Sequence, residues 1–185
     1  MRDFFKKILK VNKNINTENI LLLGALLLGL ILRTTNPNWD QGFHLHPDER
    51  AIAMFAIPLK FPASFEEFLS PSSTLNPHFF AYGNFPLYLL KLISVFAGFL
   101  NPSYASYENI NVLGRHISAV ADTLTIIIVF LIGKKLFSRK IGIFSAIFYS
   151  LSVFPIQASH YFAVDVLLVF FTTLTIYALL KFYSF

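Results

Sequence analysis

The stretch FPLYLLKLISVFAGFL, residues 85–100, decides the topology of this chain, because it is slightly shorter than a membrane crossing requires. The chain has 185 residues, of which 55% are hydrophobic and 22 are Phe, and a domain of this size cannot bury so much apolar surface in one core. We therefore expect lipid as its surroundings. The chain contains no cysteine, which excludes disulfides and thiolate metal sites.

Other long apolar runs predict helices that cross the membrane. The first run, ILLLGALLLGLIL, follows a basic leader over residues 1–19, which we expect in the cytoplasm. A segment rich in Pro, Ser and Asn comes next and predicts a large outer loop over residues 36–112. The predicted spanning helices cover residues 20–35, 113–137, 141–160 and 164–183. The fold class predicted is an all-α membrane protein with four spanning helices.

The basic residues favour an interfacial helix over residues 85–100. If this stretch crosses the bilayer, the basic turn GKKLFSRK faces outward, and Asp165 lies across the membrane from Asp48. If it lies on the outer surface, ten of the 15 Lys and Arg residues face the cytoplasm, as the positive-inside rule prefers. Small or polar residues also recur at near-helical spacing along it, namely Asn84, Lys91, Ser94, Gly98 and Asn101. A short spanning helix with a snorkelled lysine is the alternative.

The interfacial arrangement gathers polar chemistry on the outer side. All of the 5 histidines lie on or near that side, together with most of the acids. The acids are Asp40, Asp48, Glu49, Glu66, Glu67, Glu108 and Asp165. The net charge of +5 and the pI near 9.5 are explained by topology, since no aromatic-basic pattern indicates a nucleic-acid partner.

The motif HPDE, residues 46–49, closely follows the first apolar run. Pro47 restricts His46 to an extended conformation and suits the first turn of a helix, so Asp48 and Glu49 are predicted to open a short helix near the membrane surface. A helix dipole favours acids there, which is a purely structural alternative. His44 and His46 also suit an extended pair of metal ligands, and carboxylates with His suit a divalent ion.

Three charged residues stand on the later apolar runs. Asp165 lies at the outer end of the last run, where an ionisable group is costly unless it meets a partner or a water-filled cavity; it is either functional or a helix-capping carboxylate. Arg115 can counter a carboxylate, bind a phosphate or snorkel. Asp122 lies about two turns deeper, and we expect it to pair with another helix.

In this order, the motifs resemble the amino-terminal part of GT-C fold membrane glycosyltransferases. The resemblance is to the protein O-mannosyltransferase-like group, also called dolichyl-phosphate-mannose-protein mannosyltransferase-like, and to bacterial aminoarabinose transferases. The stretches that carry it are HPDE, NPHFFAYGNFPLYLL, GRHISAVADTLTIIIVFLIGKKLFSRKIGIFSAIFYSL and IQASHYFAVDVLLVFFTTL. Family members run beyond such a length, so the resemblance implies an amino-terminal piece that is inactive alone.

The resemblance implies a reaction and its partners. The donor is a polyprenyl-phosphate sugar used at the extracytoplasmic side of the plasma membrane, and the acceptor is a hydroxyl on a glycan, a lipid or a protein. By position, Asp48 resembles the catalytic acid, with Glu49 its neighbour, and Asp165 resembles the second acid, so the resemblance implies Asp48, Glu49 and Asp165 as catalytic residues. One carboxylate base acting once predicts inversion at the anomeric carbon.

The resemblance also implies binding residues. Arg115 matches an arginine that supports the structure or contacts the donor phosphate. The further substrate-binding candidates are His78, Tyr82 and Lys91. Some relatives hold a divalent metal ion, for which the candidates are Asp48, Asp165 and His46. The alternative function is that of a non-catalytic membrane scaffold or transporter fragment, in which the acids only cap helices.

Overall fold

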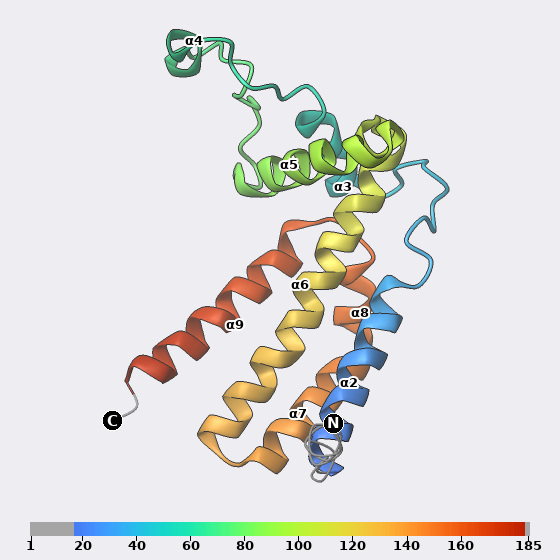
Figure 1. The fold of residues 1–185 in the computed structure, drawn as a ribbon, viewed down its shortest axis with the longest axis vertical. Helices are drawn as coiled ribbons and strands as arrows, with labels where there is room; N and C mark the ends of the chain where they lie inside the picture. The colour runs from blue at the N-terminus through green and yellow to red at the C-terminus, as the bar shows by residue number, and fades with distance from the viewer. Residues whose placement is uncertain (1–16, 184–185) are drawn as a thin grey trace, which may run out of the picture.

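The computed structural model describes residues 17–183, and within this range the chain folds into helices joined by turns and loops. Most of the expected cytoplasmic leader, residues 1–19, lies outside the described residues. α2 (Thr17–Thr34), α6 (Tyr107–Leu136) and α7 (Arg139–Leu151) run alongside one another, and α9 (Val164–Phe182) leans away from α6 toward its C-terminal end (Figure 1).

Three of these helices are long and apolar enough to cross a membrane, namely α2, α6 and α9. A fourth crossing is formed if α7 and the following α8 (Val153–Ser159) count as one span, bent by 56°. The predicted class, an all-α membrane protein, is confirmed. α6 begins earlier than the predicted 113–137, and its 30 residues reach about 45 Å, so it is longer than the roughly 30 Å hydrocarbon layer.

The break between α7 and α8 differs from the unbroken helix predicted over residues 141–160. Ser152 takes φ −66 and ψ 126, which is an extended conformation and ends α7. Pro155 then lies in the first turn of α8, where its missing N–H costs nothing. A proline inside the predicted run was therefore the visible signal of this bend.

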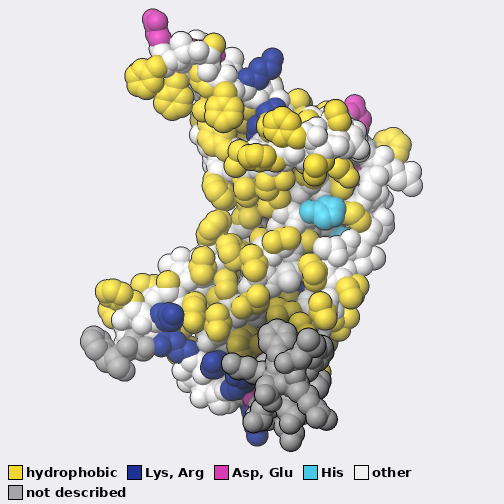
Figure 2. Space-filling model, in the orientation of Figure 1, with side chains coloured by type: hydrophobic (Ala, Val, Ile, Leu, Met, Phe, Trp, Pro, Cys, Tyr) yellow, Lys and Arg dark blue, Asp and Glu magenta, His cyan; other side chains and the backbone are white. Residues whose placement is uncertain are grey.

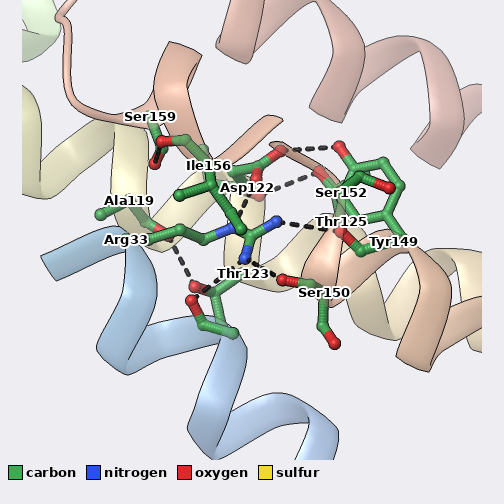
Figure 3. Close-up of polar contacts among 12 residues, drawn as sticks. Arg33, Ala119, Asp122, Thr123, Thr125, Tyr149, Ser150, Ser152, Ile156 and Ser159 are labelled. Atoms are coloured by element: carbon green, nitrogen blue, oxygen red, sulfur yellow. Dashed lines mark hydrogen bonds and ion pairs between the residues drawn. The ribbon is translucent and has the colours of Figure 1, made fainter. Parts of the chain in front are cut away.

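A buried arginine fastens α2 to the end of α7 (Figure 3). Arg33 donates from Nε to Asp122 of α6, and Nη1 donates to the Ser150 carbonyl at 3.0 Å. The Tyr149 hydroxyl donates to Asp122 Oδ1 at 2.6 Å. Carbonyls in the last turn of a helix have no partner within it, so Arg33 supplies donors where the bend leaves them free. Asp122 thus pairs with another helix, as expected.

Near the α6–α7 turn, the backbones of these two helices are in close contact. A Cβ added at Gly142 would lie 2.6 Å from the Phe130 carbonyl oxygen and 2.8 Å from the Lys134 nitrogen. Beside this contact, buried Ile126, Phe130, Ile143 and Ala146 form an apolar cluster between the two helices.

The segment between α2 and α6 contains α3 (Pro47–Ala56), α4 (Phe65–Leu69), α5 (Phe85–Leu100) and the short 3₁₀ helix η1 (Pro102–Ala105). α5 has the range expected for it, and it runs across the end of α6 rather than alongside it (Figure 1). Its buried residues belong to a core with α3, α6 and α9 that includes Ile52, Leu87, Leu90, Ile110, Phe162 and Val166.

Two residues of the polar stripe predicted along α5, Ser94 and Gly98, turn toward the protein. Ser94 is 1% exposed and donates to the Lys91 carbonyl at 2.8 Å, and Gly98 faces Ala105 of η1. Large apolar side chains of α5 are exposed instead, including Phe96 at 63% and Phe99 at 81%. An exposed apolar surface on a helix that lies across the bundle end fits contact with lipid.

Side-chain types divide along the bundle (Figure 2). Hydrophobic side chains cover much of the visible surface, and basic ones gather at the end that holds the α6–α7 turn. At that end Arg139 pairs with Glu18 at 2.7 Å. The acids expected to do chemistry lie at the opposite end, where α3 and α9 begin.

Candidate active site

The N-termini of α3, α6 and α9 meet at one end of the bundle (Figure 1). Asp48 lies in the first turn of α3, and Asp165 lies in the first turn of α9. The Phe162 N–H donates to Glu49 Oε1 at 3.2 Å, which ties the segment before α9 directly to α3. Both acids of interest therefore lie at the same end of the molecule.

The start of α3 follows from its local sequence. His46 is extended, with φ −78 and ψ 122, and its Nδ1 accepts the Glu49 N–H at 3.4 Å. Pro47 follows as the first helical residue, as its fixed φ favours. Consecutive helical residues point about 100° apart, so the two acids of the motif face different surroundings.

Glu49 faces the interior and binds Arg115. The guanidinium donates from Nε to Glu49 Oε1 at 2.8 Å and from Nη2 to Oε2 at 2.6 Å. It also donates to Asp40 Oδ1 at 2.9 Å and Oδ2 at 2.7 Å, and to the Pro37 carbonyl at 2.8 Å. These bonds occupy all the N–H groups of Arg115. Of the roles predicted for Arg115, the structure shows that of a counter-ion to carboxylates, and no donor is left for a phosphate.

Asp40 completes this buried ion network, and sequence reasoning counted it only among the outer acids. Its hydrogen bonds from Arg115 lower its pKa from the ordinary 3.8 to about 2, although burial opposes this shift. Asp40 also accepts the N–H groups of Gly42 and Leu45, each at 3.3 Å. An Asp followed two residues later by Gly is a turn signal that can be read from the sequence. In the structure, Gly42 has φ +82, a left-handed conformation that suits such a turn.

Asp48 differs from Glu49 in being partly exposed. Its Oδ1 accepts the Tyr82 hydroxyl at 2.8 Å, and within residues 17–183 no hydrogen bond reaches its Oδ2. Tyr82 has its pKa raised, first by the hydrogen bond it donates to Asp48 and then by burial and by the negative charges of Asp48 and Asp165. Asp165 itself is exposed to solvent.

Two other predicted residues stand apart from this pair of acids. His78 is exposed and has a left-handed backbone with φ 50; in the described part of the chain, no hydrogen bond or ring contact joins it to Asp48. Lys91 donates from Nζ to the Ile57 carbonyl at 2.7 Å and lines a different groove. The structure brings Tyr82 to the acids, but it shows no such contact for His78 or Lys91.

The predicted metal ligands do not form a cluster. Among residues 17–183, no three His, Asp or Glu side chains lie together in the way that a metal site requires. His46 instead accepts from the Glu49 N–H and stacks on Tyr161, with ring centroids 4.4 Å apart. Within the described residues, Asp48, Asp165 and His46 are thus not part of such a cluster.

An apolar groove opens between α5, α6 and α9. Its volume is about 360 Å³, and its walls include Phe85, Leu113, His116, Leu167 and Phe171. Phe85 follows Tyr82 by three residues in the chain, and Leu167 follows Asp165 by two. Figure 2 shows hydrophobic side chains along the concave face between α5 and α9.

The fold and the site define a membrane protein with carboxylates gathered at one end of its helices. Residues 109–184 match the model of a protein family described as dolichyl-phosphate-mannose-protein mannosyltransferase, which confirms the resemblance drawn from the motifs. The match takes in Arg115, Asp165 and nearly all of α6 to α9, and it begins after α3 and Asp48. No curated protein and no solved structure matches the chain.

Proposed function

We propose that this chain belongs to a membrane glycosyltransferase that moves a sugar from a polyprenyl-phosphate donor to an acceptor hydroxyl. The family match supports a membrane mannosyltransferase of the GT-C type. The observation that carries the proposed chemistry is Asp48, a partly exposed carboxylate with one oxygen held by Tyr82 and the other without a hydrogen bond from residues 17–183.

In this proposal, Asp48 Oδ2 accepts the proton of the acceptor hydroxyl as its oxygen attacks the anomeric carbon. The bond from that carbon to the phosphate oxygen breaks, and the lipid phosphate leaves with the bonding electron pair. A phosphate is a weak base and needs little help from an acid, whereas the hydroxyl needs a base within hydrogen-bond reach. One displacement gives inversion at the anomeric carbon.

The neighbouring residues take supporting roles. Tyr82 orients Asp48 by its hydrogen bond, and Glu49 with Arg115 and Asp40 fixes the start of α3 against α6. Because both oxygens of Glu49 are bound and the residue is 0% exposed, we assign it to positioning rather than to proton transfer. Asp165 adds a second negative charge near the phenol, where it orients an acceptor hydroxyl.

The membrane arrangement of the proposal follows from the same geometry. α2, α6, the bent pair α7–α8, and α9 cross the bilayer, while α5 lies at its outer surface. The basic α6–α7 end then faces the cytoplasm, as the positive-inside rule prefers, and the acids face the extracytoplasmic side of the plasma membrane. The apolar groove between α5, α6 and α9 lies at the height of the lipid, where it accommodates the donor's isoprenoid chain.

The experiment measures consumption of polyprenyl-phosphate sugars by membranes that contain the full protein, with the products identified by mass spectrometry. We expect a fall of about 10²- to 10⁴-fold in transfer for Asp48→Asn, which keeps the shape but removes the base. The matched control is Glu66→Gln, which neutralises an exposed acid on α4 and should leave transfer unchanged. Full transfer by a folded Asp48→Asn protein would overturn the assignment of Asp48 as the base, whereas no transfer by the unaltered protein would leave the scaffold alternative.

A further inference from the structure

α5 carries a second groove on a face that the proposed reaction does not use. Leu87, Leu90 and Ser94 are buried in the protein, whereas Tyr88, Lys91, Leu92, Val95, Phe96 and Phe99 follow one another at helical spacing along another side. This second side forms one wall of a groove of about 710 Å³. The loop residues Leu59, Lys60, Phe61 and Leu75 form the other wall.

The walls of this groove are apolar, but two lysines face it. Lys91 is half-buried and spends one N–H on the Ile57 carbonyl at 2.7 Å, which leaves two N–H groups for other acceptors. Burial, followed by the nearby charge of Lys60, lowers the pKa of Lys91. Lys60 is exposed, and its side chain has no hydrogen bond from residues 17–183.

No acid in the described part of the chain neutralises this pair of cations. Neither lysine takes part in an ion pair within residues 17–183. Glu67 is the acid tied to the same loop, and its oxygens accept the Ala63 N–H at 2.7 Å and the Thr74 hydroxyl at 2.8 Å. Two like charges beside an apolar groove are therefore complementary to an anion that also has an apolar part.

Charge and shape together select the occupant. A free phosphate matches the lysines but leaves the apolar walls exposed, including Phe96 at 63% and Phe99 at 81%. A phospholipid matches both, since its phosphate meets the ammonium groups and its acyl chain covers the aromatic wall. α5 lies across the ends of the long helices, which is where the proposed membrane arrangement puts lipid headgroups.

We propose that the groove between α5 and the 59–75 loop binds one anionic phospholipid of the bilayer, with its phosphate between Lys60 and Lys91 and an acyl chain along Val95, Phe96 and Phe99. This lipid is a bound component of the membrane surface rather than the sugar donor. It holds the 59–75 loop against α5, and this loop directly follows α3, which carries Asp48.

The test is native mass spectrometry of the purified chain in zwitterionic detergent, titrated with phosphatidylglycerol. We expect one tightly bound lipid for the unaltered chain. Each lysine near a lipid phosphate is worth a factor of about five in affinity, so binding weakens about fivefold for Lys60→Gln and about 30-fold for Lys60→Gln/Lys91→Gln. The matched control, Lys140→Gln/Lys181→Gln, removes two lysines from the opposite end and leaves the affinity unchanged.

The source of the phosphate is decided by competition. Phosphatidylcholine and inorganic phosphate are expected to displace phosphatidylglycerol only at concentrations more than tenfold higher. Displacement by a polyprenyl phosphate at lower concentration than phosphatidylglycerol would overturn the proposal, because the groove would then be a donor site. Equal affinity of Lys60→Gln and the unaltered chain for phosphatidylglycerol would also overturn the proposal. Because Lys60 is exposed, this single substitution keeps the test valid even if the double variant does not fold.

Discussion

Tyr82 donates its hydroxyl to Asp48 Oδ1 at 2.8 Å, and this bond joins the loop before α5 to the first turn of α3. It occupies one carboxylate oxygen and directs the other away from the phenol. The same phenol lies within the field of Asp165, which raises the Tyr82 pKa along with Asp48.

Tyr82→Phe is expected to lower transfer about tenfold or more without loss of folding, because a hydrogen bond to a charged carboxylate is worth about 1.5 to 3 kcal/mol. The measurement is kcat of the full protein with a saturating polyprenyl-phosphate sugar. Tyr88→Phe is the control, since its hydroxyl donates to the Leu75 carbonyl at 3.1 Å and not to an acid. Equal losses in the two variants would show that Tyr82 has no special relation to the reaction.

Arg115→Lys is expected to destabilise the fold by about 3 kcal/mol or more, because a lysine cannot replace a guanidinium that binds two buried carboxylates. Thermal unfolding in detergent measures this loss. The chain contains 1 tryptophan, Trp39, whose ring centroid lies 4.9 Å from the Arg115 guanidinium. The fluorescence emission of Trp39 should therefore shift to the red in Arg115→Lys. Arg50→Lys, an exposed change on α3, should alter neither signal; an unchanged melting temperature for Arg115→Lys would contradict the network's role.

The pH dependence of stability should reveal Asp40. Its pKa is lowered from 3.8 to about 2, so its charged form stabilises the folded state fully above about pH 4, and this contribution is lost as the pH falls toward 2. Asp40→Asn should therefore be less stable than the unaltered chain at pH 6, and the difference should shrink between pH 4 and 2. Unfolding curves in detergent across that range give the comparison. A difference that is constant with pH would count against this ion pair.

Gly142→Ala should separate α6 from α7. The added Cβ would lie 2.6 Å from the Phe130 carbonyl oxygen and 2.8 Å from the Lys134 nitrogen, and backbone atoms cannot move aside as a side chain can. We expect a loss of about 1 to 3 kcal/mol in stability, measured by thermal unfolding. Gly24→Ala is the control, since nothing lies within 4 Å of its added Cβ. Equal stabilities for the two variants would refute the close helix contact.

Local signals in the sequence predicted the local features well. Pro47 after an extended His46 predicted the start of α3, and the apolar stretch FPLYLLKLISVFAGFL predicted the range of α5. Both features depend on residues that are neighbours in the chain. The bend at Ser152 was missed because the length of the apolar run outweighed the Pro155 signal.

The sequence alone could not identify the long-range partners of the buried ionisable side chains. Asp122 was expected to pair with another helix, but its partner Arg33 is 89 residues away, and only the folded packing identifies it. Arg115 had several open roles for the same reason: its carboxylate partners Asp40 and Glu49 are 75 and 66 residues away. The chemistry of an ionisable side chain follows from what the fold places beside it.

The account depends most on Asp48 and Asp165 sharing one face of the membrane. Because the chain contains no cysteine, each of the variants Asp48→Cys, Asp165→Cys and Lys140→Cys carries a single cysteine. Position 140 lies at the opposite end of the molecule from positions 48 and 165. The decisive measurement is the reaction of each with a membrane-impermeant maleimide added outside intact cells. We predict labelling of positions 48 and 165 from outside, and of position 140 only after permeabilisation. Labelling of positions 48 and 165 from opposite sides would contradict the account.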